Sequence, residues 1–226
     1  MCGRYGLYRP TDVLAKDFGA REAQGLRERY APSYNIAPTA DVVGLAAGEQ
    51  GERILDLYRW GLAGRLFNAR AESLAASHAF GGAMRRRRLA LLADGFFEWR
   101  QSPGRRGQPL FFTRADGTPL ALAGIWEARD STLRTCSMVT TAAGTDIAEV
   151  HDRMPVILEP DALEVWLDPA SRNLDELEGV LRPAPGGTLV HHAVDPRVGD
   201  VRNDSPDLIL PFQSPTDEFE ALRLFG

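Results

Sequence analysis

The sequence predicts an α+β fold, in which peripheral helices surround a curved, mostly antiparallel sheet or barrel-like core. Short apolar runs alternate with Gly, Pro and Asp residues, a pattern typical of strands joined by turns. Helical periodicity is limited to a few short segments. The 226 residues, 44% of them hydrophobic, contain no repeat or long linker, so we expect one domain over residues 1–212, followed by an acidic tail over residues 213–226.

Local patterns place the helices and strands along the chain. Thr11 can cap a first helix, Pro160 suits the first turn of another, and Asn173 with Glu176 matches a capping box. Helices are therefore expected over residues 11–18, 71–77 and 160–167 and from residue 174 onward. Strands are expected in the apolar runs over residues 53–60, 89–92, 95–99, 109–113, 119–126, 133–141 and 188–194. The order of the strands does not follow from these patterns.

The net charge of −5 hides an uneven distribution along the chain. Residues 1–156 carry 21 Lys and Arg against 17 Asp and Glu, whereas residues 157–226 carry 5 against 14. The first part can therefore offer a basic surface to nucleic acid although the whole chain is acidic.

Composition also bears on the localisation of the protein and on its need for a membrane, a metal or a cofactor. No N-terminal stretch combines the basic and apolar parts of a signal peptide, and no run approaches the roughly 18 apolar residues that span a bilayer. We therefore expect a soluble, cytoplasmic monomer without a membrane partner. Cys2 and Cys136 are the only cysteines, and no metal-binding spacing appears, so we expect no metal. We also expect no cofactor.

Cys2 offers the most distinctive chemistry, because removal of Met1 would leave it with a free amine and a thiol on adjacent carbons. Such an aminothiol can condense with an aldehyde and close a five-membered thiazolidine ring. Both groups have reference pKa values of roughly 8 to 8.5, so reactive forms of each are present at neutral pH. The alternative is that Cys2 is an ordinary second residue behind a retained or trimmed Met1.

Glu98 and His151 carry groups suited to proton transfer. Glu98 lies in an apolar segment, and strand alternation puts it on the same face as Phe96, where poor solvation would raise its pKa. His151 precedes the apolar run over residues 156–158, and its reference pKa of about 6.5 leaves both protonation forms accessible. The alternatives are an edge-strand glutamate in water and a histidine with a structural role.

Asn68 and Arg70 open the helical pattern expected from residue 71, and helix N-termini together with guanidinium groups can hold a phosphate. The alternative makes Asn68 an N-cap and Arg70 a surface charge. The arginine run over residues 85–88 could follow a phosphate backbone in the same way, or be simply solvated.

A set of short motifs extends from residue 2 to about residue 211. The motifs are Cys2-Gly-Arg4, Asn35-Ile-Ala-Pro38, Arg59-Trp-Gly-Leu62, Asn68-Ala-Arg-Ala-Glu72, Ala93-Asp-Gly-Phe-Phe-Glu-Trp99, Thr140-Thr141, His151-Asp-Arg-Met-Pro155 and Arg202-Asn-Asp204. In identity and order they resemble the motifs of the SRAP family, the SOS response-associated peptidases. A collinear set of this kind is far more specific than any single motif.

The resemblance implies covalent capture of abasic sites in single-stranded DNA through a thiazolidine at Cys2, without a cofactor, by a protein that is nucleoid-associated when bound to DNA. It also implies self-catalysed removal of Met1 and a weak abasic-site lyase activity. Glu98 would assist ring opening and proton transfer, His151 would steady the sugar hydroxyl, and Asn68 would orient the amine or the sugar. The residues expected to contact DNA are Arg4, Asn35, Trp60, Arg70, Arg85 and Arg153.

One departure from the family pattern and two other functions stay open. Members of the family usually carry a longer loop with Pro and Trp where this chain has only residues 63–67, so Trp60 or Phe67 would have to stack on a base instead.

A thiol-dependent hydrolase with Cys2 as its nucleophile would turn over its own leader, or a peptide or amide substrate, rather than trap an adduct. A non-catalytic single-strand DNA-binding module would bind in a salt-sensitive way, indifferent to an abasic site.

Overall fold

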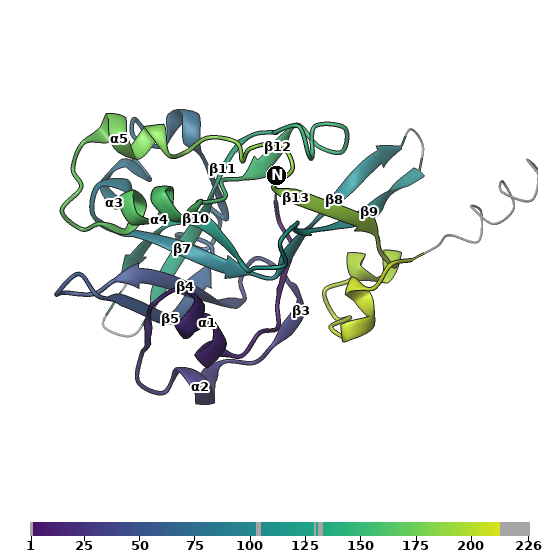
Figure 1. The fold of residues 1–226 in the computed structure, drawn as a ribbon, viewed down its shortest axis with the longest axis horizontal. Helices are drawn as coiled ribbons and strands as arrows, with labels where there is room; N and C mark the ends of the chain where they lie inside the picture. Colours follow the sequence, from purple (N-terminus) through teal and green to yellow (C-terminus); the bar gives the residue numbers. More distant parts are fainter. Residues whose placement is uncertain (1, 103–104, 129, 131–132, 213–226) are drawn as a thin grey trace, which may run out of the picture.

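Strands dominate the fold (Figure 1). The computed structural model describes residues 2–102, 105–128, 130 and 133–212, and the acidic tail expected over residues 213–226 lies outside them. The strands are β1 (Tyr5–Leu7), β2 (Arg21–Glu22), β3 (Ser33–Ile36), β4 (Asp41–Ala47), β5 (Arg53–Trp60), β6 (Asn68–Arg70), β7 (Arg88–Ala93), β8 (Gly95–Ser102), β9 (Arg105–Arg114), β10 (Leu120–Ala128), β11 (Arg134–Ala142), β12 (Arg153–Pro155) and β13 (Leu189–Ala193). The helices are α1 (Thr11–Asp17), α2 (Leu26–Arg29), α3 (Gly81–Arg86), α4 (Pro160–Leu167) and α5 (Leu174–Gly179), with 3₁₀ turns η1 (Ala71–Ser73), η2 (Pro196–Gly199) and η3 (Pro206–Ile209).

The core is a barrel closed by β11. The strands β5, β4, β7, β10 and β11 pair in that order with antiparallel neighbours. β11 then returns to β5 as a parallel neighbour, with Cys136 opposite Trp60. All six residues of β7 are buried, so this strand is buried on both of its faces. The α+β prediction with a curved, mostly antiparallel, barrel-like core is confirmed.

A second sheet, with the order β13-β9-β8-β1-β3, borders the barrel. Its strand β8 is buried on both faces over residues 95–98. Phe96 stacks on Phe112 in the main core, whereas Phe97 packs on Phe111 in a smaller apolar cluster under the C-terminal segment. In Figure 1 the N-terminal stretch runs between the barrel and the projecting β8 and β9. The start of the chain therefore contacts both sheets.

Three of the four expected helices form as α1, α4 and α5. Asn173 caps α5, because its Oδ1 accepts a hydrogen bond from the Asp175 amide at 3.0 Å. The expectation that Thr11 caps α1 is wrong, since the cap position is Pro10 and no side chain bonds there. The longest described helix, α4, has eight residues, so within the described part of the chain none approaches the roughly 20 residues of a membrane span.

The helix expected over residues 71–77 is the main error of the sequence-based prediction. Asn68 to Arg70 form strand β6 instead, and only the 3₁₀ turn η1 follows. β6 pairs in parallel with Met138 to Thr140 of β11. This backbone pairing with a distant strand is absent from the local sequence signal, and it fixes residues 68–70 as extended chain. The short strands β1, β3 and β12 and the longer β4 were missed as well.

The arginine run over residues 85–88 is divided between surface and interior. Arg85 is exposed on α3. Arg88 is 6% exposed, and its guanidinium donates hydrogen bonds to five backbone carbonyl oxygens, those of Met84, Arg85, Trp166, Asp168 and Ser171. Arg88 therefore joins β7 to the C-terminal end of α4 and is not a phosphate ligand.

This division predicts effects of very different size on stability. Arg88→Ala will lower the free energy of unfolding by about 3 kcal/mol or more, because each buried carbonyl left unpaired costs about 1 to 3 kcal/mol. Arg85→Ala will change it by less than about 0.5 kcal/mol, as exposed substitutions usually do. Urea unfolding monitored by tryptophan fluorescence measures both, and equal effects for the two variants would contradict the assignment.

Candidate active site

Cys2 is held between the barrel and the second sheet. Its carbonyl oxygen accepts a hydrogen bond from Asn68 Nδ2 at 2.8 Å. Two residues later, the Arg4 carbonyl oxygen accepts one from the Phe97 amide at 2.9 Å. The Cys2 side chain is fully buried. Residues 2–4 are therefore fixed on one side by β6 and on the other by β8.

Glu98 lies one residue beyond Phe97 and within electrostatic range of Cys2. It is 4% exposed, and its Oε1 has no hydrogen-bond partner among the described residues. Burial raises the pKa of Glu98 to about 7, and the charge of Asp152 adds to the rise. The raised pKa expected from the apolar segment is thus confirmed. Burial, followed by the charge of Glu98, raises the pKa of the Cys2 thiol well above its usual range.

Asn68 provides a second open acceptor beside Cys2. Its Nδ2 is occupied by the Cys2 carbonyl, but its Oδ1 is buried and has no partner within the described part of the chain. An unpaired buried acceptor costs about 1 to 3 kcal/mol, so two of them next to one thiol are typical of a site awaiting a ligand with hydrogen-bond donors.

His151 lies in the turn before β12. Its neighbour Asp152 is within electrostatic range of the Glu98 carboxylate. Its Nδ1 is 2.9 Å from the Arg153 amide nitrogen and also 2.9 Å from Asp152 Oδ1. Nδ1 has to accept a hydrogen bond in the contact with Arg153 and to donate one in the contact with Asp152. Because burial lowers the pKa of His151, the neutral ring is favoured at neutral pH, so Nδ1 accepts from Arg153 and Nε2 carries the proton. Protonation would instead let Nδ1 donate to Asp152.

Thr140 of β11 is a neighbour of both Arg70 and Arg153. Arg70 is exposed and pairs with Thr140 across the β6–β11 ladder, on the same strand face as Asn68. Arg153 Nη2 donates to the Thr140 carbonyl at 2.7 Å, and its guanidinium forms a bidentate ion pair with Glu72 at 2.5 and 2.9 Å. Glu72 lies in the same motif as Asn68 and Arg70 but was not expected from the sequence to have a role.

Arg4 and Asn35 are occupied by protein groups. Asn35 is 4% exposed, and its Oδ1 accepts from Arg4 Nη1 at 2.8 Å. Its Nδ2 donates toward backbone carbonyls of the C-terminal segment. The expectation that Asn35 contacts DNA therefore does not fit the structure, because both ends of the amide are already bonded inside the protein.

Three other residues were expected to contact DNA or to stack on a base. Trp60 is fully buried, and its Nε1 donates to the Phe67 carbonyl at 2.9 Å, so its ring cannot stack on a base. Phe67 is partly buried and packs against the main core. Arg85 lies on α3, which packs against β7 and β10.

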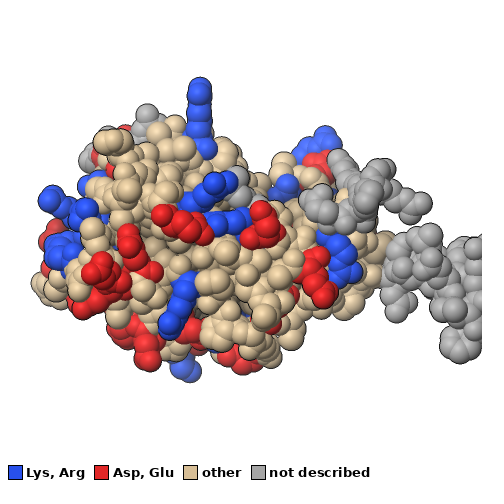
Figure 2. Space-filling view, turned by 90° about the horizontal axis from the view of Figure 1, so that it is seen from above, with Lys and Arg blue, Asp and Glu red and all other residues tan. Residues whose placement is uncertain are grey.

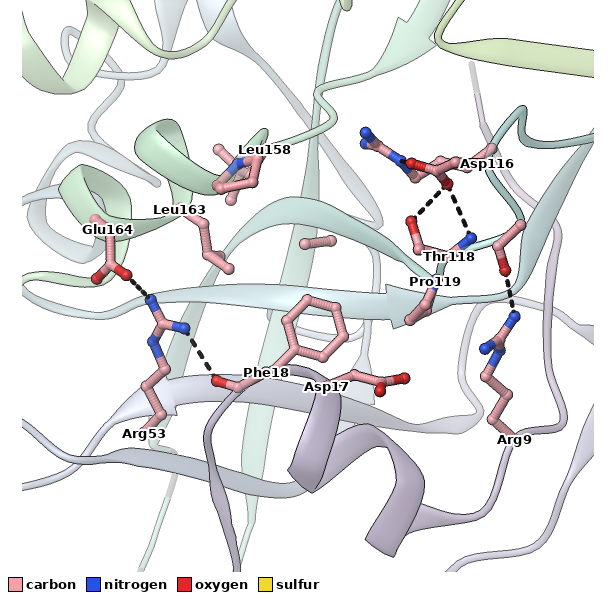
Figure 3. A pocket seen from close by; sticks show the side chains of 14 residues that line it. Arg9, Asp17, Phe18, Arg53, Asp116, Thr118, Pro119, Leu158, Leu163 and Glu164 are labelled. Atoms are coloured by element: carbon pink, nitrogen blue, oxygen red, sulfur yellow. Dashed lines mark hydrogen bonds and ion pairs between the residues drawn. The ribbon is translucent and has the colours of Figure 1, made fainter.

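A large cavity lies elsewhere on the protein. It has a volume of about 560 Å³ and is bounded by α1, α4 and the turn between β9 and β10 (Figure 3). Its three arginines already have partners: Arg9 bonds Asp94, Arg53 bonds Glu164, and Arg114 bonds Glu159. None of Cys2, Glu98 and His151 lines it, so this cavity is not where their chemistry would occur.

Basic and acidic side chains are mixed on the surface. The face shown in Figure 2 carries Lys and Arg side chains directly beside Asp and Glu side chains, without a continuous basic band. The excess of positive charge in residues 1–156 is therefore not gathered into one broad patch on this face.

Comparisons with known proteins identify the family of this chain. The sequence model of the SOS response associated peptidase (SRAP) family matches residues 1–201. The chain belongs to the SRAP family. It is 31% identical to the abasic site processing protein YedK of Escherichia coli (strain K12), over 93% of this chain and 100% of that protein. It is 30% identical to the abasic site processing protein YoqW of Bacillus subtilis (strain 168), over 92% of this chain and 99% of that protein.

The fold of this SRAP protein is also found in solved structures. A crystal structure of a protein from Bacteroides thetaiotaomicron superposes with a TM-score of 0.81, covering 94% of this chain and 100% of that chain at 17% identity. At this identity the match supports the fold alone.

Proposed function

We propose that this SRAP protein captures abasic sites in single-stranded DNA as a thiazolidine formed with Cys2 after Met1 is removed. The observation that carries the proposal is the buried Glu98, with its pKa raised to about 7 and its Oε1 open, next to a residue that becomes an aminothiol. Relatives matched over nearly the whole chain are named abasic site processing proteins, which supports the same substrate here.

The first steps convert the closed sugar into an imine. Ring opening breaks the bond between C1′ and O4′, and the hydroxyl proton on C1′ is passed to O4′, which leaves an aldehyde. The Cys2 amine adds to C1′, and one proton moves from nitrogen to the former carbonyl oxygen. The second nitrogen proton then passes to this hydroxyl, which leaves as water, and a C=N double bond forms. Glu98 can give and take back these protons because a group with a pKa near the working pH is present in both forms.

Ring closure completes the capture. The Cys2 sulfur attacks C1′ of the imine, and its proton passes to the imine nitrogen, so the ring contains S, C1′, N, Cα and Cβ. Over all steps one water is released and Glu98 is returned to its starting state. Asn68 holds the Cys2 carbonyl, and holding amine, thiol and aldehyde together replaces a slow encounter between molecules. His151 Nε2–H is suited to donate a hydrogen bond to the sugar hydroxyl. Asn68 Oδ1 is suited to accept one from the Cys2 amine.

Phosphates flanking the lesion would be bound by Arg70 and Arg153. Arg70 is exposed and lies two residues along β6 from Asn68, roughly 7 Å at the usual rise of a strand. Arg153 is partly buried and paired with Glu72 before DNA arrives. A phosphate would therefore have to compete with Glu72 for this guanidinium.

Glu72→Gln will tighten binding to single-stranded DNA, because the substitution leaves Arg153 without its carboxylate partner and frees its charge for a phosphate. The slope of log K against log salt should steepen by about 0.7 if one further phosphate is contacted. Glu49→Gln is the matched control, since Glu49 is exposed on a distant turn and the net charge changes equally. Fluorescence anisotropy at several salt concentrations measures both, and equal changes would contradict a role for Glu72.

The decisive experiment mixes the Met1-processed protein with a single-stranded oligonucleotide carrying one abasic site and resolves the products on a denaturing gel. A heat-resistant shifted band is expected with the abasic strand and not with the intact strand. A protein that cleaves peptides or amides with turnover and leaves no adduct would support the hydrolase alternative. Equal salt-sensitive binding to both strands without a band would support the non-catalytic alternative.

A further inference from the structure

Asn35 is a buried amide that the proposed chemistry does not use. Its Nδ2 lies 3.2, 3.1 and 2.7 Å from the backbone carbonyl oxygens of Val198, Asp200 and Asn203. Residues 196–203, named here the carbonyl loop, are thus tied to β3 through one side chain. An amide nitrogen has two hydrogens, so the three carbonyl oxygens within reach are enough to accept hydrogen bonds from both.

The other end of the Asn35 amide reaches Arg4. Arg4 Nη1 donates to Asn35 Oδ1 at 2.8 Å and to the Val198 carbonyl at 2.6 Å. The guanidinium also lies 5.9 Å from the centre of the Trp99 ring, within the range of a cation–π contact. Arg4 is therefore held by β3, by the carbonyl loop and by β8 at once.

The backbone of Arg4 links this network to the active site. Its carbonyl oxygen accepts from the Phe97 amide at 2.9 Å, one residue before Glu98, and it lies two residues after Cys2. A shift of Arg4 would move Cys2 relative to Glu98. Misplacement of reacting groups by about 1 Å can lower a rate by about 10²-fold.

We propose that Asn35 is a positioning residue that, through Arg4, couples the carbonyl loop to the placement of Cys2 against Glu98. Asn35 and Arg4 then act on the rate of the reaction rather than on DNA affinity. This inference rests on the proposed function for its activity readout, but the network itself can be tested in the free protein.

The test compares Asn35→Ala and Arg4→Lys with the unchanged protein, all as full chains processed at Met1. Affinity is measured with a single strand carrying a tetrahydrofuran residue, which lacks the aldehyde. The single-turnover crosslinking rate is measured with saturating abasic strand. We expect the rate to fall by about 10- to 100-fold while the Kd changes less than about threefold. Val201→Ala is the matched control, because Val201 is 54% exposed in the same loop and should leave both values unchanged.

Hydrogen exchange gives a readout that does not need the reaction. In Asn35→Ala the Phe97 amide, which bonds the Arg4 carbonyl, should exchange about 10-fold faster while amides of β7 keep their protection. A higher Kd with an unchanged rate would assign Asn35 and Arg4 to DNA binding, and unchanged exchange at Phe97 would also overturn the inference. If the unchanged protein forms no crosslink, the proposed function fails and the exchange result still decides whether Asn35 holds Arg4.

Discussion

Cys2→Ala will abolish the heat-resistant crosslink to an abasic oligonucleotide. The variant keeps an N-terminal amine and can still form an imine, but it has no sulfur to close the ring, so water reverses the adduct. We expect no shifted band on a denaturing gel unless borohydride is added to reduce the imine to a stable amine. This pattern would separate the contribution of the thiol from that of the amine.

Cys136→Ala is the matched control for the loss of a thiol. Cys136 is fully buried in β11, where burial raises its thiol pKa well above the usual range, so it is not a nucleophile. This variant should crosslink as the unchanged protein does, once a modest loss of stability is allowed for by working well below its Tm. A heat-stable band from Cys2→Ala without reductant would sink the thiazolidine mechanism.

Glu98→Gln will slow crosslinking by about 10²- to 10⁴-fold, the usual contribution of a general acid or base. Glutamine has nearly the same shape but cannot give or take a proton. The unchanged protein should show a rate that varies with pH around the Glu98 pKa of about 7, whereas the variant should lack this dependence. Single-turnover rates between pH 5 and pH 9 measure both effects, and a variant with the full rate would remove Glu98 from the mechanism.

The same substitution should stabilise the fold at high pH. The folded pKa of Glu98, about 7, lies above the ordinary value of 4.5, so the native state keeps a proton that the unfolded chain loses. The free energy of unfolding therefore falls as the pH rises from 4.5 through about 7, by up to about 3 kcal/mol. Glu98→Gln should be more stable than the unchanged protein at pH 8 and equally stable at pH 4, as urea unfolding at the two pH values will test. Equal stability at pH 8 would contradict the burial of the charge.

Much of the fold was predictable because long apolar runs bounded by turn residues carry their own signal. β5, β7, β8, β10 and β11 all lie where the alternation placed them. The segment over residues 71–77 was not predictable, because the helix signal there is weak and the neighbouring residues 68–70 gain hydrogen bonds from β11. Short strands such as β1 and β12 exist only because a partner strand is already in place.

The sequence by itself determined the kinds of chemistry available: an aminothiol at Cys2 once Met1 is removed, and a carboxyl in an apolar strand at Glu98. These are local properties of a residue and its immediate neighbours. Only the tertiary structure decided which groups meet, because the contacts join distant parts of the chain. Asn68 is 66 positions from Cys2, Arg153 is 81 from Glu72, and Val198 is 163 from Asn35. Closure of the barrel and packing of β8 bring these partners together, and no local sequence pattern predicts these long-range contacts.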